Sequence, residues 1–181
     1  MDLLEFTDCE LYFEEAMPAR VESLIALASA NYGSVEAELG LLQAFLLAPE
    51  NLAVLVSLYR YYFYQHRLDD AETVAERAMA VTADRLGLPR HWQKLDEGAA
   101  AAGAARSFGM LRFYLLALKA SAIISLRQGK LDDARQRLEK LMELDSRDQL
   151  GAGALMTVLL ESDSLPPSTT QPHLAKEIHH G

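Results

Sequence analysis

The side chains able to do chemistry in this 181-residue chain are few and widely spaced. None of its histidines forms a His-x-x-x-His pair, or a Glu-x-x-His pair within a predicted helix, the spacings with which helices hold a metal. Cys9 is the single cysteine and has no basic neighbour in sequence that would lower its pKa. The stretch from Glu97 to Gly109 is rich in Gly and Ala but lacks the Lys-Ser/Thr of a phosphate loop, so it is interpreted as a flexible link. We therefore expect no catalytic set, no metal site and no cofactor. The histidines are His66, His91, His173, His179 and His180.

Composition and charge restrict the class of protein further. Half of the residues are hydrophobic and a quarter are charged, as in ordinary globular proteins. A formal charge of -9 argues against a nucleic-acid or anionic-membrane surface, because both need clustered Lys and Arg. A single cysteine excludes an internal disulfide framework and fits a reducing compartment. Residues 1–17 contain six acidic and no basic residues, the reverse of a targeting segment, so we expect a cytoplasmic protein.

The most apolar stretch of the chain runs from Phe108 to Leu126. It is long enough to suggest a membrane span, but Arg112 and Lys119 interrupt it, and charges at the centre of a bilayer are costly. These two residues lie seven apart, hence on one face of a helix, and the other faces are apolar. The pattern favours a buried helix of a helical protein over a membrane span.

A repeat in the sequence indicates the helices that would position a binding site. The stretch RLDDAETVAERAM begins at Arg67, and the nearly identical stretch KLDDARQRLEKLM begins at Lys130. A period of about 34 residues carries Ala71, the alanine of the first copy, back to Ala37 in a third helical pattern. Three windows of this length follow, at about 18–51, 52–85 and 115–148, with an insert at 86–114.

Each window predicts two helices joined by a turn. The turns contain Tyr32-Gly33-Ser34, His66-Arg67-Leu68, and Gly129 followed by Lys130, which are helix-stop and helix-start signals. Asp-Asp in the first turn of two of the second helices suits the positive end of a helix dipole. No strand pattern with hairpin signals occurs, so the fold class is all-α.

Three helix–turn–helix pairs of this period resemble the tetratricopeptide repeat (TPR) family. The resemblance covers about 100 of the 181 residues, in two blocks. A small alanine before the core of the second helix occurs in all three windows, at Ala37, Ala71 and Ala134. The family's glycine in the first helix is replaced by larger side chains, which implies wider helix spacing there. Other matches in the second window are Leu55, Leu58, Tyr59, Tyr62, Ala75 and Ala83.

The resemblance implies an α-solenoid of three TPR-like helix pairs in a single domain over residues 1–161. Residues 1–17 are acidic and amphipathic, and they form either a capping helix or a short arm. Residues 149–161 predict the capping helix that such arrays need. Residues 162–181, rich in Ser, Thr and Pro, predict a flexible tail.

The insert is the largest departure from the repeat. Its last part, from about Ala104, has no strong helix breaker and is expected to extend the first helix of the third window by two or three turns. Such an extension exposes Phe108, Met110, Leu111 and Phe113. These apolar side chains need a cover: Trp92 of the insert, the acidic N-terminal segment, or a second copy of the chain, of which we favour the second copy.

The function that the resemblance implies is binding of another protein. The first helices of TPR pairs line a concave groove that takes a peptide or a helix. The positions that the resemblance places on this groove are Ala53, Val56, Arg60, Phe63, Tyr64, Leu116, Lys119, Ile123 and Leu126. The Lys, Asn and Arg set with which some family members hold a C-terminal carboxylate is absent here. The groove is apolar and aromatic with two isolated cations, which suits an apolar segment carrying a carboxylate or two.

Two alternatives to a general adaptor remain open, a chaperone and an assembly factor. Small acidic three-repeat proteins that act as cytosolic chaperones of secretion substrates, or as assembly factors, are similar in size and charge.

The burial of the aromatic run YRYYFYQ, from Tyr59 to Gln65, is a separate open question. The run either faces an open groove or packs on neighbouring helices as part of the core.

Overall fold

The computed structural model describes residues 16–163, and these are all-α. The predicted acidic arm at 1–17, except its last two residues, and the predicted tail at 162–181, except its first two, lie outside this range. Within it there are eight α-helices and one 3-10 turn, and no strand. They are α1 (Ala19–Ala30), α2 (Val35–Leu47), α3 (Leu52–Tyr64), α4 (Leu68–Leu86), η1 (Trp92–Lys94), α5 (Glu97–Arg106), α6 (Phe108–Arg127), α7 (Leu131–Leu144) and α8 (Ala152–Asp163).

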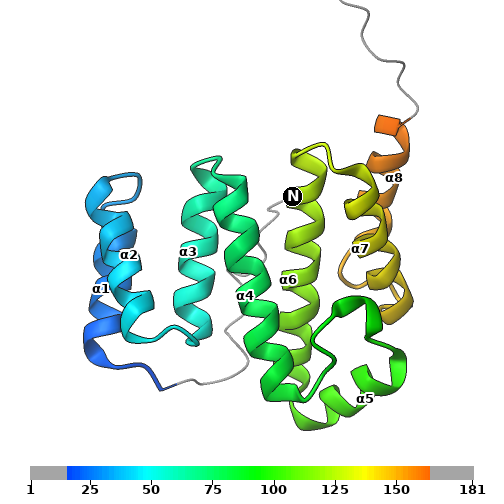
Figure 1. The fold of residues 1–181 in the computed structure, drawn as a ribbon, viewed down its shortest axis with the longest axis horizontal. Helices are drawn as coiled ribbons and strands as arrows, with labels where there is room; N and C mark the ends of the chain where they lie inside the picture. Colours follow the sequence, from blue (N-terminus) through cyan, green and yellow to red (C-terminus); the bar gives the residue numbers. More distant parts are fainter. Residues whose placement is uncertain (1–15, 164–181) are drawn as a thin grey trace, which may run out of the picture.

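All the helices except α5 lie side by side in a row that follows the order of the chain, and α5 lies at one end of α6 and α7 (Figure 1). The most extensive contacts are between α1 and α2, between α3 and α4, and between α6 and α7, together with the contact of α4 on α6. At the end of the row α8 packs against α7. The predicted windows thus each contain two neighbouring helices that pack on one another.

Several helices begin at a side-chain cap that the sequence encodes. Ser34, Asn51, Asp96 and Ser107 each accept a hydrogen bond from the backbone N–H three residues later, at 2.7–3.3 Å. Each bond satisfies one of the N–H groups that a helix start leaves without an intrahelical partner. These caps fix the starts of α2, α3, α5 and α6.

The two copies of Leu-Asp-Asp-Ala start from turns with nearly the same backbone. Arg67 (φ -86°, ψ 72°) and Lys130 (φ -81°, ψ 68°) precede the two helices, and each donates its N–H to the carbonyl five residues earlier, at 3.0 and 2.9 Å. The residue before each of them is left-handed: His66 with φ 59° and Gly129 with φ 73°. The sequence echo is therefore also an echo in local structure.

The basic residue that opens each copy makes the same kind of ion pair. Arg67 Nη1 lies 2.6 Å from Glu38 of α2, and Lys130 Nζ lies 3.1 Å from Glu72 of α4. Glu38 and Glu72 are separated by one period of the repeat, as Ala37 and Ala71 are. Each pair joins a turn to the second helix of the preceding pair, so the repeated residues tie neighbouring helix pairs together.

The alanines used to align the windows are all buried, as predicted. Ala37 is 1% exposed, and Ala71 and Ala134 are fully buried. All three stand in the first turn of the second helix of a pair. A small side chain there allows close approach of the first helix, because protein interiors are close-packed.

Two parts of the insert differ from their predicted structure. The Gly- and Ala-rich stretch predicted to be a flexible link is helical, as α5. Asp96 caps this helix, and Ala100 and Gly103 are buried on its inner side. Gly103 approaches Leu88 so closely that an added Cβ would lie 2.9 Å from that side chain. Tertiary packing on Leu88 thus orders a segment whose composition suggested a loop.

The second difference is where the long apolar helix begins. It begins at Phe108, because Ser107 is extended (φ -159°) and caps the new helix through Met110 N–H. The extension beyond the repeat window is thus two turns, and α5 precedes it as a separate helix. Arg106, at the end of α5, donates to the carbonyl of Leu86 and so fastens the insert to the end of α4.

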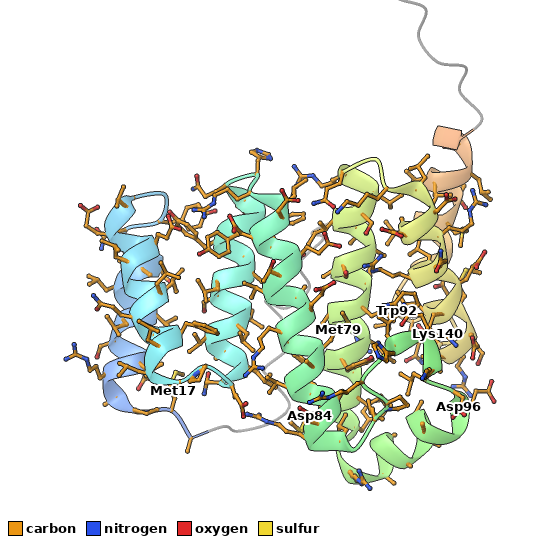
Figure 2. The ribbon with its side chains drawn as sticks, viewed as in Figure 1. Met17, Met79, Asp84, Trp92, Asp96 and Lys140 are labelled. Atoms are coloured by element: carbon orange, nitrogen blue, oxygen red, sulfur yellow. The ribbon has the colours of Figure 1, made fainter. Side chains whose placement is uncertain are left out.

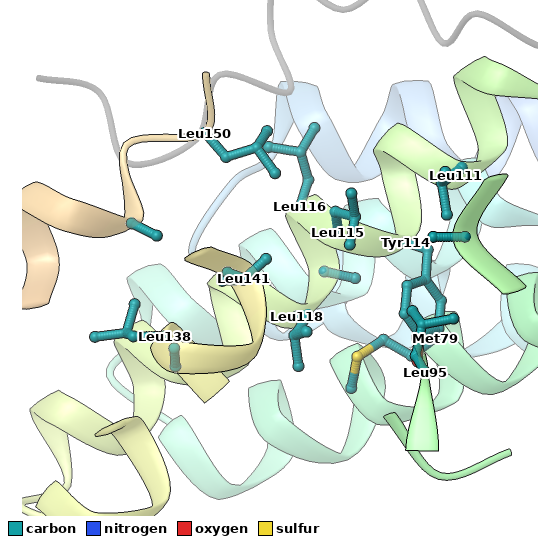
Figure 3. Close-up of a cluster of buried hydrophobic side chains, with 14 of the residues drawn as sticks. Met79, Leu95, Leu111, Tyr114, Leu115, Leu116, Leu118, Leu138, Leu141 and Leu150 are labelled. Carbon is teal, nitrogen blue, oxygen red and sulfur yellow. The ribbon is translucent and has the colours of Figure 1, made fainter. Parts of the chain in front are cut away.

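The chain itself covers most of this extension, which removes the reason for favouring a second copy. Leu111 is 7% exposed and Phe113 is 4% exposed, and Phe108 alone of the four apolar side chains stays largely exposed, at 67%. Leu111 belongs to a cluster with Leu95 of the insert, in which Met79 and Tyr114 also meet (Figure 3). In the described part of the chain α6 is the one helix long and apolar enough to cross a membrane, but 67% of its apolar window is buried inside the protein. That burial is typical of a core helix.

Candidate binding pocket on the first helices

The first helices of the pairs, α1, α3 and α6, meet in one apolar cluster. Val21 of α1, Phe63 of α3 and Ile123 of α6 all belong to it. We call the surface that these three helices present the first-helix face. It is the face on which the sequence predicted a binding groove.

A cavity opens on this face between α1 and α3. Its volume is about 540 Å³, comparable with small-ligand or peptide side-chain pockets. We call it the tyrosine pocket. Its lining residues are Ala28, Ser29, Tyr32, Leu41, Ser57, Arg60, Tyr61 and Tyr64.

Three tyrosines form the wall of the tyrosine pocket. Tyr32 meets Tyr61 and Tyr64 edge to face, with ring centroids 5.8 and 6.4 Å apart. Tyr61 is buried and donates its hydroxyl to the carbonyl of Ser34 at 3.2 Å, so its ring is held in place. Tyr32 and Tyr64 remain 51% and 45% exposed. The exposed rings of Tyr32 and Tyr64, beside the fixed ring of Tyr61, offer an aromatic surface to an incoming side chain.

Arg60 supplies the charge of this pocket. It is half-buried, and no carboxylate within residues 16–163 pairs with it. Burial raises the pKa of Tyr32, and the Arg60 charge acts on that pKa in the opposite direction. The Tyr32 phenol therefore keeps its proton at neutral pH and is a neutral donor. The pocket can receive a carboxylate beside aromatic rings.

The other cations of α3 and α6 also lack acidic neighbours on their own helices. The sequences of α3 and α6 contain Arg and Lys but no Asp or Glu. Arg112 and Lys119 of α6 are half-buried and make no ion pair within the described residues. By contrast, Arg67, Arg77 and Lys130 all pair with glutamates. The part of the first-helix face that α3 and α6 present is thus electropositive in a chain whose net charge is -9.

The nine positions predicted for the groove divide between surface and core. Arg60 and Tyr64 line the tyrosine pocket. Half-buried side chains stand at Ala53, Val56, Lys119 and Leu126.

The remaining three predicted positions are core residues. Phe63, Leu116 and Ile123 are 4%, 9% and 5% exposed. Phe63 stacks on Tyr59 with ring centroids 5.7 Å apart, and the Arg127 guanidinium covers it at 4.8 Å. Placing these three in an open groove is therefore wrong. They turn toward neighbouring helices, because both sides of α3 and α6 are apolar and neighbours cover one of them.

Sequence reasoning misses some of the pocket residues. Tyr32 follows the end of α1, where the sequence predicts only a turn, and Tyr61 and Ser57 lie on the side of α3 that faces α1. Turn chemistry gives no sign that the Tyr32 ring folds back onto α3. An aromatic residue directly before a Gly-Ser turn is the available signal.

A second, polar cavity of about 390 Å³ lies where the insert meets α4 and α7. Trp92 is half-buried there, and the Arg137 guanidinium lies 5.6 Å from its ring centre. Arg137 also reaches Glu72 at 3.5 Å, and Lys140 donates to the Leu95 carbonyl at 3.0 Å. Figure 2 places Trp92 and Lys140 close together on this side of the molecule. These contacts attach the insert to α7.

The described residues contain no group of three or more His, Cys, Asp or Glu side chains placed to hold a metal ion. His66 lies in a turn, where its Nδ1 is 2.8 Å from Arg127 Nη2. Cys9 and the histidines at 173, 179 and 180 lie outside the described range. Among the described residues, the polar and aromatic side chains that line the tyrosine pocket are Ser29, Tyr32, Ser57, Arg60, Tyr61 and Tyr64.

The described part of the protein is all-α, with neighbouring helices that pack in pairs. No family model matches the chain, and no solved structure matches it. The chain is 44% identical over 161 residues to an uncharacterized 19.8 kDa protein encoded in the nifW 5′ region of Azotobacter chroococcum mcd 1. The match covers 89% of this chain and 90% of the relative. The chain belongs to the same family as that protein.

Proposed function

We propose that this protein is a non-catalytic, cytoplasmic adaptor built as an α-solenoid of three TPR-like helix pairs with α8 as the cap. The repeated turn geometry and the repeated ion pairs of Arg67 and Lys130 support the interpretation as a repeat. The insert between the second and third pairs is a local addition to the array. In this proposal the first helices present the binding surface to a partner protein.

The partner segment is apolar or aromatic and carries at least one carboxylate. The observation that carries this proposal is Arg60, a half-buried cation without an acidic partner among the described residues, in an open pocket of tyrosines. A carboxylate that reaches it forms a charge-assisted hydrogen bond in a partly desolvated site, and such bonds contribute about 1.5–3 kcal/mol. An aromatic side chain next to it fits against the exposed rings of Tyr32 and Tyr64.

The relative's name indicates the first partner to test. Its gene lies in the region 5′ to nifW, and genes that lie together are often expressed together. An adaptor or assembly factor encoded there would act on a neighbouring product, so the nifW product is the first candidate.

The test is a calorimetric titration of the full chain with the nifW product, with two matched arginine variants. Arg60→Gln is expected to weaken binding at least tenfold, from the loss of about 1.5–3 kcal/mol. Arg90→Gln is the control, because the Arg90 side chain is 83% exposed on the insert and lies outside the tyrosine pocket. Equal affinity of the parent and Arg60→Gln would refute the pocket as the binding site. Absence of any binding would remove the nifW product as the partner.

A further inference from the structure

The charges of this chain are unevenly divided between residues 1–15 and the first helices. Residues 1–15 read MDLLEFTDCELYFEE and contain six acidic and no basic residues. The helices α3 and α6 contain basic but no acidic residues. One short segment thus holds nearly a quarter of the 26 acidic residues of the chain, whereas α3 and α6 hold none.

The same segment also matches the face in its apolar character. It contains six large apolar or aromatic side chains: Leu3, Leu4, Phe6, Leu11, Tyr12 and Phe13. On the α3 and α6 part of the face, Val56 and Leu126 are half-buried and apolar. An acidic, aromatic segment is the ligand chemistry that Arg60 and its surroundings favour.

The position of Met17 brings this segment to the face. Met17 is half-buried and packs against the apolar cluster that α1, α3 and α6 share (Figure 2). Fifteen extended residues reach at most roughly 50 Å. Neighbouring helix axes lie about 8–10 Å apart, so α6, two first helices away from α1, is well within reach.

We propose that residues 1–15 dock across the first-helix face, over α3 and α6, as an intramolecular ligand. The carboxylates of the segment neutralise Arg60, Arg112 and Lys119, and its aromatic side chains cover half-buried apolar residues of the two helices. This inference rests on the same first-helix face as the proposed function, but its test needs no partner protein.

Tethering makes such docking effective even for a weak segment. A short flexible tether holds the segment at an effective concentration on the order of 1 mM. With a free-segment dissociation constant of about 0.1 mM, the docked form exceeds the open form by about tenfold. A partner that needs the same surface then binds about tenfold more weakly than to an open face.

Cys9, the single cysteine, provides a reporter in the middle of the segment. A nitroxide attached to Cys9 in the full chain is expected to broaden the amide NMR signals of Val56 and Lys119. The signal of Glu139, exposed on α7 away from the first-helix face, should keep its width. A variant with Glu5→Gln, Asp8→Asn and Glu10→Gln should lose the broadening. Equal widths at all three sites, or broadening that survives in this variant, would overturn the proposal.

Two further measurements separate docking within one chain from contacts between chains and from effects of the label. Mixing nitroxide-labelled chains with isotope-labelled, nitroxide-free chains reports contacts between copies, and broadening that appears only in the mixture would overturn intramolecular docking. The second uses no attached label: the rate at which Cys9 reacts with an aromatic disulfide. We expect this rate to be at least fivefold lower in the parent chain than in the triple variant. Equal rates would overturn the proposal even if the nitroxide itself disturbs docking.

Discussion

Phe63 and Tyr64 are adjacent on α3, yet the structure assigns one to the core and the other to the pocket. Phe63 is 4% exposed, stacked on Tyr59 and covered by Arg127, whereas Tyr64 is 45% exposed at the pocket wall. Truncation of a buried Phe costs about 3–5 kcal/mol, because contacts are lost and a cavity remains. In a domain of about 150 residues, 1 kcal/mol lowers the melting temperature by about 2–4 °C. Phe63→Ala is therefore expected to lower it by about 6–20 °C.

The matched control is Tyr64→Ala, which removes an exposed ring with two edge-to-face neighbours. It should cost no more than about 1 kcal/mol, or a shift below about 4 °C, because exposed substitutions rarely exceed this. Thermal unfolding followed by far-UV circular dichroism measures both shifts. Phe63→Leu, which keeps most of the volume, should lose less than about 1.5 kcal/mol. If Phe63→Ala and Tyr64→Ala melt within about 2 °C of one another, the division between core and pocket is wrong.

Two other predictions concern the turns and the buried tyrosines. Gly129→Ala should destabilise the chain by about 1–2 kcal/mol in denaturant unfolding, because φ is 73° there and nothing lies within 4 Å of the added Cβ, so the cost is backbone strain alone. The control is Gly98→Ala in the first turn of α5, which should be neutral or stabilising. Equal effects of the two substitutions would contradict the strain argument. Burial raises the pKa of Tyr114 to about 12 and raises the pKa of Tyr59 further. The folded state then holds protons that the unfolded state releases near pH 10, so the free energy of unfolding should fall as pH rises from about 10 to 12. Tyr114→Phe should show a shallower fall over this range, and an unchanged slope would contradict the assignment.

Outside the insert, the sequence alone predicted the helices and their grouping to within a few residues. Caps such as Ser34 and the left-handed Gly129 are local signals, because a helix end is decided by hydrogen bonds within one turn. The burial of Ala37, Ala71 and Ala134 was also predictable, since the period of the repeat places each of them against its partner helix. These features need only short stretches of chain.

Only the tertiary structure decided which side of each apolar helix is covered. Almost every position of α3 is apolar or aromatic, so its 3.6-residue periodicity does not distinguish Phe63 from Tyr64. The position of α6 buries Phe63, whereas the ring of Tyr32 makes Tyr64 part of a pocket. The same holds for the insert, where packing of Gly103 on Leu88 orders a stretch whose composition predicted a loop. Sequence periodicity determines which faces can be buried, whereas burial itself depends on neighbours that are distant in sequence.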